Sequence, residues 1–349
     1  MLTAMLNKKS STKNIGLFNP QEVERKTDLI LRILLNSRDP LGSRVISRKM
    51  EEMGVSLSER TVRYHLRIAD ERGLTRLVGR RDGRVITPKG IEELKHSRVQ
   101  DKIGFVISRI ESLAFRTTFD PVSKQGLVPV NISYFEKGQF DEAVDLMLPV
   151  FKSGLAVSEL VMKAEEGQTI GDTVVPPGKT ALATVCSIVV NGVLLKSGVP
   201  MDSRFGAILE ISDFQPHRFV ELIFYNGSSL DPSEAFIRAN MTSVRRAVET
   251  GSGNILANYR EIPGVCHDLT RNILENMKKS GIYGVLALGE KSKSLCQIPV
   301  DVNKIGLILI GGLNPIACAQ EAGISAEHHA MSTLLDYSAL VHIDGLTRK

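Results

Sequence analysis

Apolar residues in the first hundred positions recur at helical spacing in three short stretches, residues 23–35, 44–53 and 58–72. Ser43 precedes the second stretch and Ser58 begins the third, and serine is a favoured N-cap because its hydroxyl accepts a hydrogen bond from a free backbone N–H. The first two stretches end at turn-forming residues. We therefore predict three helices joined by short turns.

The third stretch separates two kinds of side chain. Val62, Leu66 and Ala69 fall on one side of a helix, and four long polar side chains fall on the other at i, i+3, i+4 and i+7. A cationic helix that follows another helix across a tight turn is the arrangement that places a recognition helix in the major groove. The four side chains on its polar face are Arg60, Arg63, Tyr64 and Arg67.

Two runs of residues, 74–78 and 84–87, follow this helix and are separated by a turn that contains Asp82-Gly83, a strong hairpin signal. Pro88 then opens a further helix. The hairpin is typical of the wing of a winged helix. Its arginines are placed to contact phosphates or a minor groove.

The predicted fold class is therefore an α+β winged helix-turn-helix followed by a mixed α/β regulatory domain. We expect a flexible N-terminus over residues 1–20, a DNA-binding domain over 21–100, and an effector-sensing and dimerisation domain over 101–349. The residues expected to contact DNA are Ser43, Arg44, Arg60, Thr61, Arg63, Tyr64, Arg67, Arg80, Arg81 and Arg84.

The second part of the chain alternates apolar runs with amphipathic stretches. Residues 282–288 and 304–310 are almost continuously apolar, as in buried strands, and residues 265–279 carry an apolar helical stripe. We expect parallel or mixed strands covered by helices. No internal sequence repeat is evident.

Residues 183–197 contain Asn191-Gly192 between two apolar runs, and this pattern predicts a β-hairpin with a two-residue turn. In that register Ser187 would lie opposite Lys196, with Cys186 beside the pair and Arg204 shortly after it. A hydroxyl next to cationic groups favours an anionic ligand.

Gly311-Gly312-Leu313-Asn314 follows the apolar run at 304–310, where glycines allow the backbone to approach a ligand. The spacing matches neither a P-loop nor a dinucleotide fingerprint. The residues expected to bind the effector are Cys186, Ser187, Lys196, Arg204, Gly311, Gly312 and Asn314.

The distribution of charge also changes near residue 100, at the predicted domain boundary. Residues 1–102 hold 22 Lys and Arg against 13 Asp and Glu, whereas the remainder holds 22 against 26, within a net charge of +5. A basic module joined to an acidic one favours a nucleic-acid partner for the first, because phosphate neutralisation supplies much of DNA affinity.

The four cysteines, Cys186, Cys266, Cys296 and Cys318, have no paired spacing, so we expect a reducing, cytoplasmic setting. Neither His328-His329 nor Cys266-His267 has the spacing of a zinc site, and we expect no metal, no cofactor and no enzyme activity. The N-terminal residues lack the apolar core of a signal peptide or membrane helix.

The chain resembles the archaeal nitrogen-regulation repressors of the NrpR type. The resemblance is carried in the first part by residues 41–44 and 58–66, and in the second by residues 184–188, 191–200 and 311–315. It implies a repressor of nitrogen-assimilation genes that binds a palindromic double-stranded operator as a homodimer and releases it on binding 2-oxoglutarate. Family members often carry two regulatory domains, and this chain has room for about one. A second subunit with a regulatory domain is therefore a possible partner.

Two other classes of function stay open at this stage. A metabolic enzyme with a DNA-binding head is compatible with the histidines, carboxylates and Cys318 of the second part, although these form no recognisable catalytic group. An RNA-binding winged-helix protein is the other class. The predicted recognition helix exposes one aromatic residue, Tyr64, and the chain has no Trp, so the stacking platforms of single-strand binders are not evident.

Overall fold

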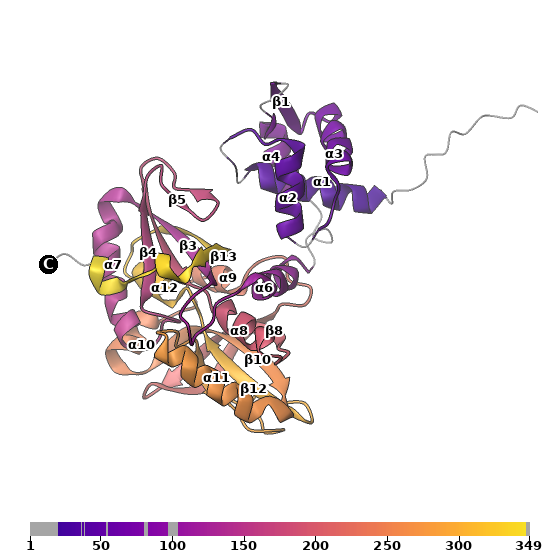
Figure 1. Ribbon diagram of the computed structural model, residues 1–349. Coiled ribbons are helices and arrows are strands. Elements are labelled where there is room, and N and C mark those ends of the chain that lie inside the picture. Colours follow the sequence, from indigo (N-terminus) through magenta and orange to yellow (C-terminus); the bar gives the residue numbers. More distant parts are fainter. Residues whose placement is uncertain are drawn as a thin grey trace, which may run out of the picture. The chain divides into compact units, whose positions relative to one another are not determined.

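The computed structural model describes residues 20–35, 37, 39–53, 55–79, 83–96 and 104–346. The chain forms two compact units, residues 1–102 and 103–349. Figure 1 shows the first from indigo to purple and the second from purple at α6 through magenta and orange to yellow. Each unit has its own apolar core and is described by itself.

The first unit is a winged helix. Its core joins three helices through fully buried side chains such as Ile30, Ile46 and Leu66. Ser58 caps the third helix and its hydroxyl accepts a hydrogen bond from the amide of Thr61 at 3.2 Å, as predicted. The elements are α1 (Pro20–Leu35), α2 (Ser43–Glu52), α3 (Glu59–Glu71), β1 (Thr75–Gly79), β2 (Gly83–Ile86) and α4 (Pro88–His96).

The second unit mixes helices with two five-stranded sheets, one ordered β13-β3-β7-β4-β14 and the other β11-β12-β10-β8-β9. Its helices are α6 (Phe105–Arg116), α7 (Phe140–Lys152), α8 (Ile188–Lys196), α9 (Pro232–Arg238), α10 (Val244–Thr250), α11 (His267–Lys279) and α12 (Asn314–Glu321). The long strands are β3 (Leu127–Glu136), β4 (Leu160–Glu165), β7 (Lys179–Val185), β8 (Asp202–Ser212), β9 (Gln215–Phe224), β10 (Gly253–Pro263), β11 (Val285–Leu288), β12 (Lys304–Ile310) and β13 (Ala326–Asp336). Shorter elements are β5 (Thr169–Ile170), β6 (Thr173–Val174), β14 (Val341–His342) and the 3₁₀ turns η1 (Lys137–Gln139), η2 (Gly264–Cys266), η3 (Tyr337–Ala339) and η4 (Ile343–Leu346).

Every strand pairing in the described part of the chain is antiparallel, so the expectation of parallel strands is wrong. The apolar runs that suggested parallel strands are buried for a different reason. Helices and connecting segments pack on the sheets, so that strands such as β7 and β12 are buried along almost their whole length.

The second unit repeats one order of elements, which the sequence did not reveal. Apart from the short strands β5 and β6, which are inserted between β4 and β7, the order β3-η1-α7-β4-β7-α8-β8 returns as β10-η2-α11-β11-β12-α12-β13, with a 13-residue helix after each 3₁₀ turn. The last strand of each repeat pairs with the first strand of the other, β8 with β10 and β13 with β3. This exchange joins the repeats into one unit.

The hairpin predicted at Asn191-Gly192 is wrong, because both residues lie inside helix α8. Seven of its nine residues are buried, which explains an apolar run without a polar face. Gly192 allows the close approach of α6, since a Cβ there would lie 2.3 Å from the Cβ of Thr117. Asn191 donates a hydrogen bond to the hydroxyl of Ser203 at 3.1 Å.

Candidate functional site

Helix α3 presents the predicted polar face to solvent. Arg60, Arg63, Tyr64 and Arg67 are exposed, while Val62, His65, Leu66 and Ala69 are buried. Arg63 and Arg67 each lie near a glutamate one turn away, at 3.8 and 3.7 Å, in solvent-exposed pairs of small energetic value. A phosphate or a base edge can therefore recruit these guanidinium groups without breaking a buried contact.

Two of the residues expected to contact DNA, Ser43 and Thr61, support the geometry of the helix-turn-helix. The Ser43 hydroxyl donates to Glu59 at 3.1 Å and so links α2 to α3. The Thr61 hydroxyl lies 2.9 Å from that of Ser58 at the start of α3. Arg44 is exposed on α2.

Arg84 is held inside the winged helix. Its Nε donates to Asp70 of α3 at 2.7 Å, and its side chain is only 21% exposed. This ion pair fixes the wing to α3, so the predicted contact of Arg84 with phosphate loses support. Arg80 and Arg81, predicted at the wing tip, lie outside the described residues.

The structure divides the residues expected to bind the effector between several places. Cys186, Ser187 and Gly312 line one pocket between the two repeats. Lys196 lies at the end of α8, where its ammonium group is 4.7 Å from the centre of the Phe115 ring. Ser187 and Lys196 do not lie opposite each other as expected from the hairpin, because they stand at the two ends of helix α8.

Asn314 and Gly311 have structural roles. The Asn314 side chain is fully buried, accepts from the amide of Leu256 at 2.8 Å, and donates to the carbonyls of Leu155 and Leu256. Gly311 donates its amide to the same Leu256 carbonyl at 2.9 Å, and a Cβ at Gly311 would overlap the backbone of Leu256. Both residues hold β12 and α12 against β10.

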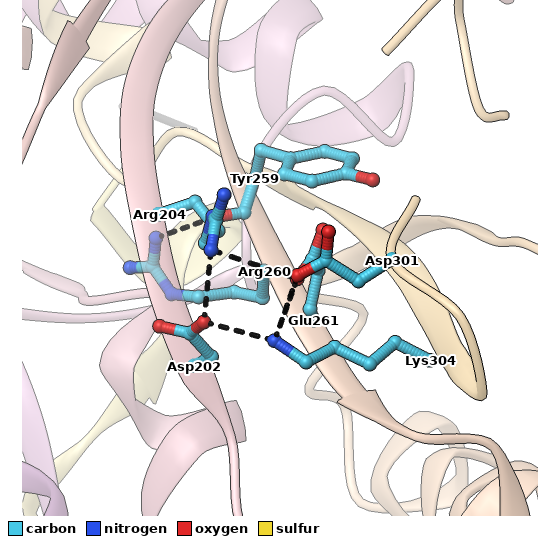
Figure 2. A network of polar contacts seen from close by, with 7 residues as sticks. All are labelled: Asp202, Arg204, Tyr259, Arg260, Glu261, Asp301 and Lys304. Atoms are coloured by element: carbon cyan, nitrogen blue, oxygen red, sulfur yellow. Dashed lines mark hydrogen bonds and ion pairs between the residues drawn. The ribbon is translucent and has the colours of Figure 1, made fainter. Parts of the chain in front are cut away.

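Arg204 belongs to a charged network on β8, β10 and β12, drawn in Figure 2 together with Tyr259 and Arg260. It pairs with Asp202 at 3.3 Å, and Lys304 pairs with the buried Glu261 at 3.0 Å and with Asp301 at 3.4 Å. Glu261 also lies 3.8 Å from Arg204. Arg204 and Lys304 already have carboxylate partners, so these two cations form a poor site for an added anion.

Arg260 is the residue that gives the pocket between the repeats its chemistry. Its side chain is 1% exposed, its Nη1 donates to the Tyr259 carbonyl at 3.1 Å, and its guanidinium lies 4.7 Å from the centre of the Tyr225 ring. Its Nε is buried without a hydrogen-bond partner, and among the described residues no carboxylate forms an ion pair with it. A buried cation without an anion is costly, and an anionic ligand would remove that cost.

Polar groups from both repeats surround Arg260. Tyr225 donates its hydroxyl proton to the Asn258 side chain at 2.5 Å, and Asn258 donates to the Ser187 hydroxyl at 3.2 Å. Asn131 accepts a hydrogen bond from the amide of Met331 at 3.0 Å. Met331 has a φ of 54°, a strained conformation of the kind that clusters at functional sites. The polar members of the lining are Asn131, Cys186, Ser187, Tyr225, Asp231, Ser233, Asn258 and Arg260.

Three ionisable groups in the pocket, Cys186, Tyr225 and Asp231, have pKa values that burial raises. Burial raises the pKa of Cys186 to about 11, so its thiol stays protonated and is a poor nucleophile. Burial, with a further contribution from Glu234, raises the pKa of Asp231 to about 6. Asp231 also caps α9, where it accepts from the amides of Ser233 and Glu234.

The pocket is small. Its free volume is about 20 Å³, the space of about one water molecule. A ligand of the size of a dicarboxylate can enter only if the walls from the two repeats move apart. Ligand binding would therefore be coupled to a change in how the repeats pack.

Sequence reasoning missed Arg260, Asn258, Tyr225 and Asp231. A usable signal was present, because Arg260 and Glu261 are charged residues within a strand that is buried from Ile255 to Ile262, and charged residues are almost never fully buried without a partner. Among the described residues, no group of three or more His, Cys, Asp or Glu could hold a metal ion. No described helix combines the length and apolarity needed to cross a membrane.

Comparison with known families matches both units. A family described as NrpR regulatory domains NRD1 and 2 matches residues 103–342, and the ribonuclease R winged-helix domain matches residues 28–94. A crystal structure of a nitrogen repressor-like protein from Methanococcus jannaschii is 28% identical with a TM-score of 0.58, and the match covers 68% of this chain and 98% of that one.

Curated relatives are named nitrogen regulators. The global nitrogen regulator NrpRI of Methanosarcina mazei is 41% identical, over 94% of this chain and all of the relative. NrpR of Methanococcus maripaludis is 32% identical over 89% of this chain, and NrpR of Methanocaldococcus jannaschii is 30% identical over 91%. The chain spans about half the length of these two, 54% and 55%.

Proposed function

The chain belongs to the NrpR family of nitrogen regulators, and from this premise we propose that it represses nitrogen-assimilation genes by binding a palindromic operator that 2-oxoglutarate makes it release. The buried, unpaired guanidinium of Arg260 is the observation that carries the effector part of this proposal. The exposed cationic face of α3 carries the DNA part.

Duplex DNA suits α3 because its arginines are long, exposed and aligned on one face, with Tyr64 between them. Arginine recognises guanine edges through paired hydrogen bonds, and each such contact contributes about 1–3 kcal/mol of discrimination. One helix reads few bases, so we expect two copies to bind half-sites about ten base pairs apart or a multiple of that spacing.

A dicarboxylate suits the pocket because one carboxylate can pair with the Arg260 guanidinium and satisfy its free Nε. Donors close to Arg260, on Asn258 and Ser187, can serve the remaining oxygen atoms. The ligand opens the space between the repeats, and it shifts the protein toward the released state only by as much as it binds that state more tightly. A nearly complete switch requires about a 10⁴-fold preference.

The test compares two arginines. Arg260→Met removes the guanidinium from the pocket at similar length, and Arg204→Met removes one from the charged network of Figure 2. Fluorescence anisotropy on labelled operator, with rising 2-oxoglutarate, measures both operator affinity and release. We expect wild type and Arg204→Met to release operator, and Arg260→Met to bind it normally without release.

The reverse result, with Arg204→Met unresponsive and Arg260→Met normal, would move the effector site to the charged network. A wild type that ignores millimolar 2-oxoglutarate would place sensing on a partner subunit with its own regulatory domain. Thermal unfolding of each variant shows whether it is folded.

RNA binding is a second candidate for the first unit, because the winged helix of ribonuclease R matches residues 28–94. Competition between labelled operator and single-stranded RNA of equal length separates the two. We expect RNA to compete weakly, since α3 offers a single exposed aromatic side chain.

A further inference from the structure

Strand β9 is an exposed edge of the second sheet. It pairs with β8 on one side and, within the described residues, with no strand on the other. Val220, Leu222 and Phe224 are 46%, 37% and 52% exposed. A ten-residue edge strand with exposed apolar side chains pairs readily with a strand of another chain unless a neighbouring segment covers it.

The apolar side chains of β9 continue the aromatic cluster of the sheet. Phe219 and Phe224 both pack edge-to-face on Phe205, with ring centres 5.4 and 5.6 Å apart, and Phe205 stacks on Tyr259. The cluster is thus buried toward β10 and open toward the edge. A surface of this kind fits an apolar strand laid beside β9.

The bulge at Val220 places two opposite charges on one face of β9. Arg218 lies opposite Glu210 of β8 and Glu221 lies opposite Ile208, and positions two apart on a strand share a face. Without the bulge, residues three apart would point to opposite faces. Arg218 donates to Glu210 at 2.6 Å, whereas Glu221 is exposed and forms no ion pair with another described residue.

The order Arg218-Phe219-Val220-Glu221 is complementary to itself. When two copies of β9 run antiparallel about a twofold axis between Phe219 and Val220, each Arg218 faces Glu221 of the second copy. Opposite charges directly across an antiparallel pair stabilise it, and like charges destabilise it. Phe219 and Val220 of both copies then meet at the axis.

We propose that β9 is the surface through which two copies of this chain dimerise, by antiparallel edge pairing that extends the second sheet across both. The interface is isologous, which means that both copies contribute the same surface, as in most twofold dimers. This inference deepens the proposed function, because a palindromic operator calls for two copies. It concerns the interface alone and is tested without DNA or effector.

The experiment uses charge reversal in the full chain. In a dimer of Glu221→Arg, both pairs across the interface join two arginines. In a dimer of Arg218→Glu, both pairs join two glutamates. Mixed in equal amounts, the two variants restore both attractive pairs in a heterodimer. Glu275→Arg reverses an exposed charge on α11 and is the matched control.

Sedimentation equilibrium and native mass spectrometry measure the assembly. We expect a dimer for wild type and Glu275→Arg, a dimer dissociation constant raised at least tenfold for each single variant, and a heterodimer in the mixture. A monomeric wild type, a single variant that dimerises like wild type, or a mixture without heterodimer would overturn the interface.

Operator binding, measured separately, distinguishes this failure from failure of the proposed function. If Glu221→Arg dimerises normally and binds operator normally, β9 is not the interface and the repressor function stands. If the β9 dimer forms as expected but no operator is bound, the interface stands and the DNA-binding function fails.

Discussion

The two repeats of the second unit share a scaffold and differ where a strand meets a helix. After β7 the corner is Cys186-Ser187, and after β12 it is Gly311-Gly312. The first corner contributes a thiol and a hydroxyl to the pocket. At the second, a Cβ on Gly312 would lie 2.5 Å from Nδ2 of Asn131, so the absence of a side chain lets the repeats approach.

The two repeats also differ in the first turns of the helices that follow these corners, α8 and α12. Asn191-Gly192 of α8 occupies the position of Ile316-Ala317 in α12, six and seven residues after the last residue of the preceding strand. In α8 the glycine admits α6 and the asparagine bonds to Ser203, whereas Ile316 and Ala317 are apolar core. A duplicated scaffold thus acquires one asymmetric polar pocket through a few substitutions at equivalent positions.

A side chain added at the Gly311-Gly312 corner should have the largest effect on the free energy of unfolding. In Gly311→Ala, the new Cβ would lie 2.4–2.8 Å from atoms of Leu256, two of which belong to its backbone and cannot rotate away. We expect a loss of unfolding free energy of about 3 kcal/mol, the upper part of the usual range for overpacking. Urea unfolding of the full chain measures it.

Gly138→Ala is the control for that substitution, because nothing lies within 4 Å of its added Cβ. Equal unfolding midpoints for Gly311→Ala and wild type would show that β10 and α12 can separate at this corner, and the contrast between the two corners would lose its physical basis.

The two asparagines beside the corners provide a second comparison. Asn258→Ala leaves the Tyr225 hydroxyl and the Ser187 hydroxyl without their partner, and Asn131→Ala leaves the Met331 amide without one. Each change should cost about 1–3 kcal/mol of stability, since a buried polar group loses its hydrogen bond.

Effector binding should separate the same two variants. Asn258 lies two residues from Arg260 on β10, so both side chains share a face, and we expect its loss to weaken 2-oxoglutarate binding more than loss of Asn131. Isothermal titration calorimetry measures the two affinities. Equal losses would mean that the ligand uses both repeats alike.

The winged helix was predictable from sequence because its signals are local. The Ser58 cap, glycine and proline breaks and a 3.6-residue period agree from α1 to α4, and the buried and exposed faces of α3 follow directly. Ser43 is not the N-cap of α2 as expected, because it is the first residue of that helix and Gly42 precedes it as the cap. The residues that could contact DNA were less predictable than the fold, since Arg84 has a partner, Asp70, that no local pattern reveals.

The pocket was not predictable, because its chemistry depends on contacts between distant segments. The Asn191-Gly192 dipeptide favours a hairpin when judged alone, and only packing against Thr117 explains its place in a helix. Ser187 and Arg260 meet because β7 and β10 belong to repeats that exchange their last strands. Sequence reasoning therefore grouped Cys186, Ser187 and Gly312, which line one pocket, with Lys196 and Arg204, which do not line it.

The smallest expected effect is a pH dependence that comes from one side of the pocket. Burial raises the pKa of Asp231 to about 6, so this carboxyl group is mostly ionised at pH 7.5 and mostly protonated at pH 5.5. A bound dianion disfavours the ionised form and raises that pKa further, so affinity for 2-oxoglutarate should increase as the pH falls. A further rise of about one pKa unit corresponds to about a tenfold change in affinity.

The variant Asp231→Asn keeps the side-chain oxygen that caps α9 and removes the charge, so it should bind 2-oxoglutarate equally well at both pH values. Calorimetric titrations at pH 5.5 and 7.5 decide the point: an unchanged pH slope in Asp231→Asn would assign the dependence to another group, of which the neighbouring Glu234 is the first to replace.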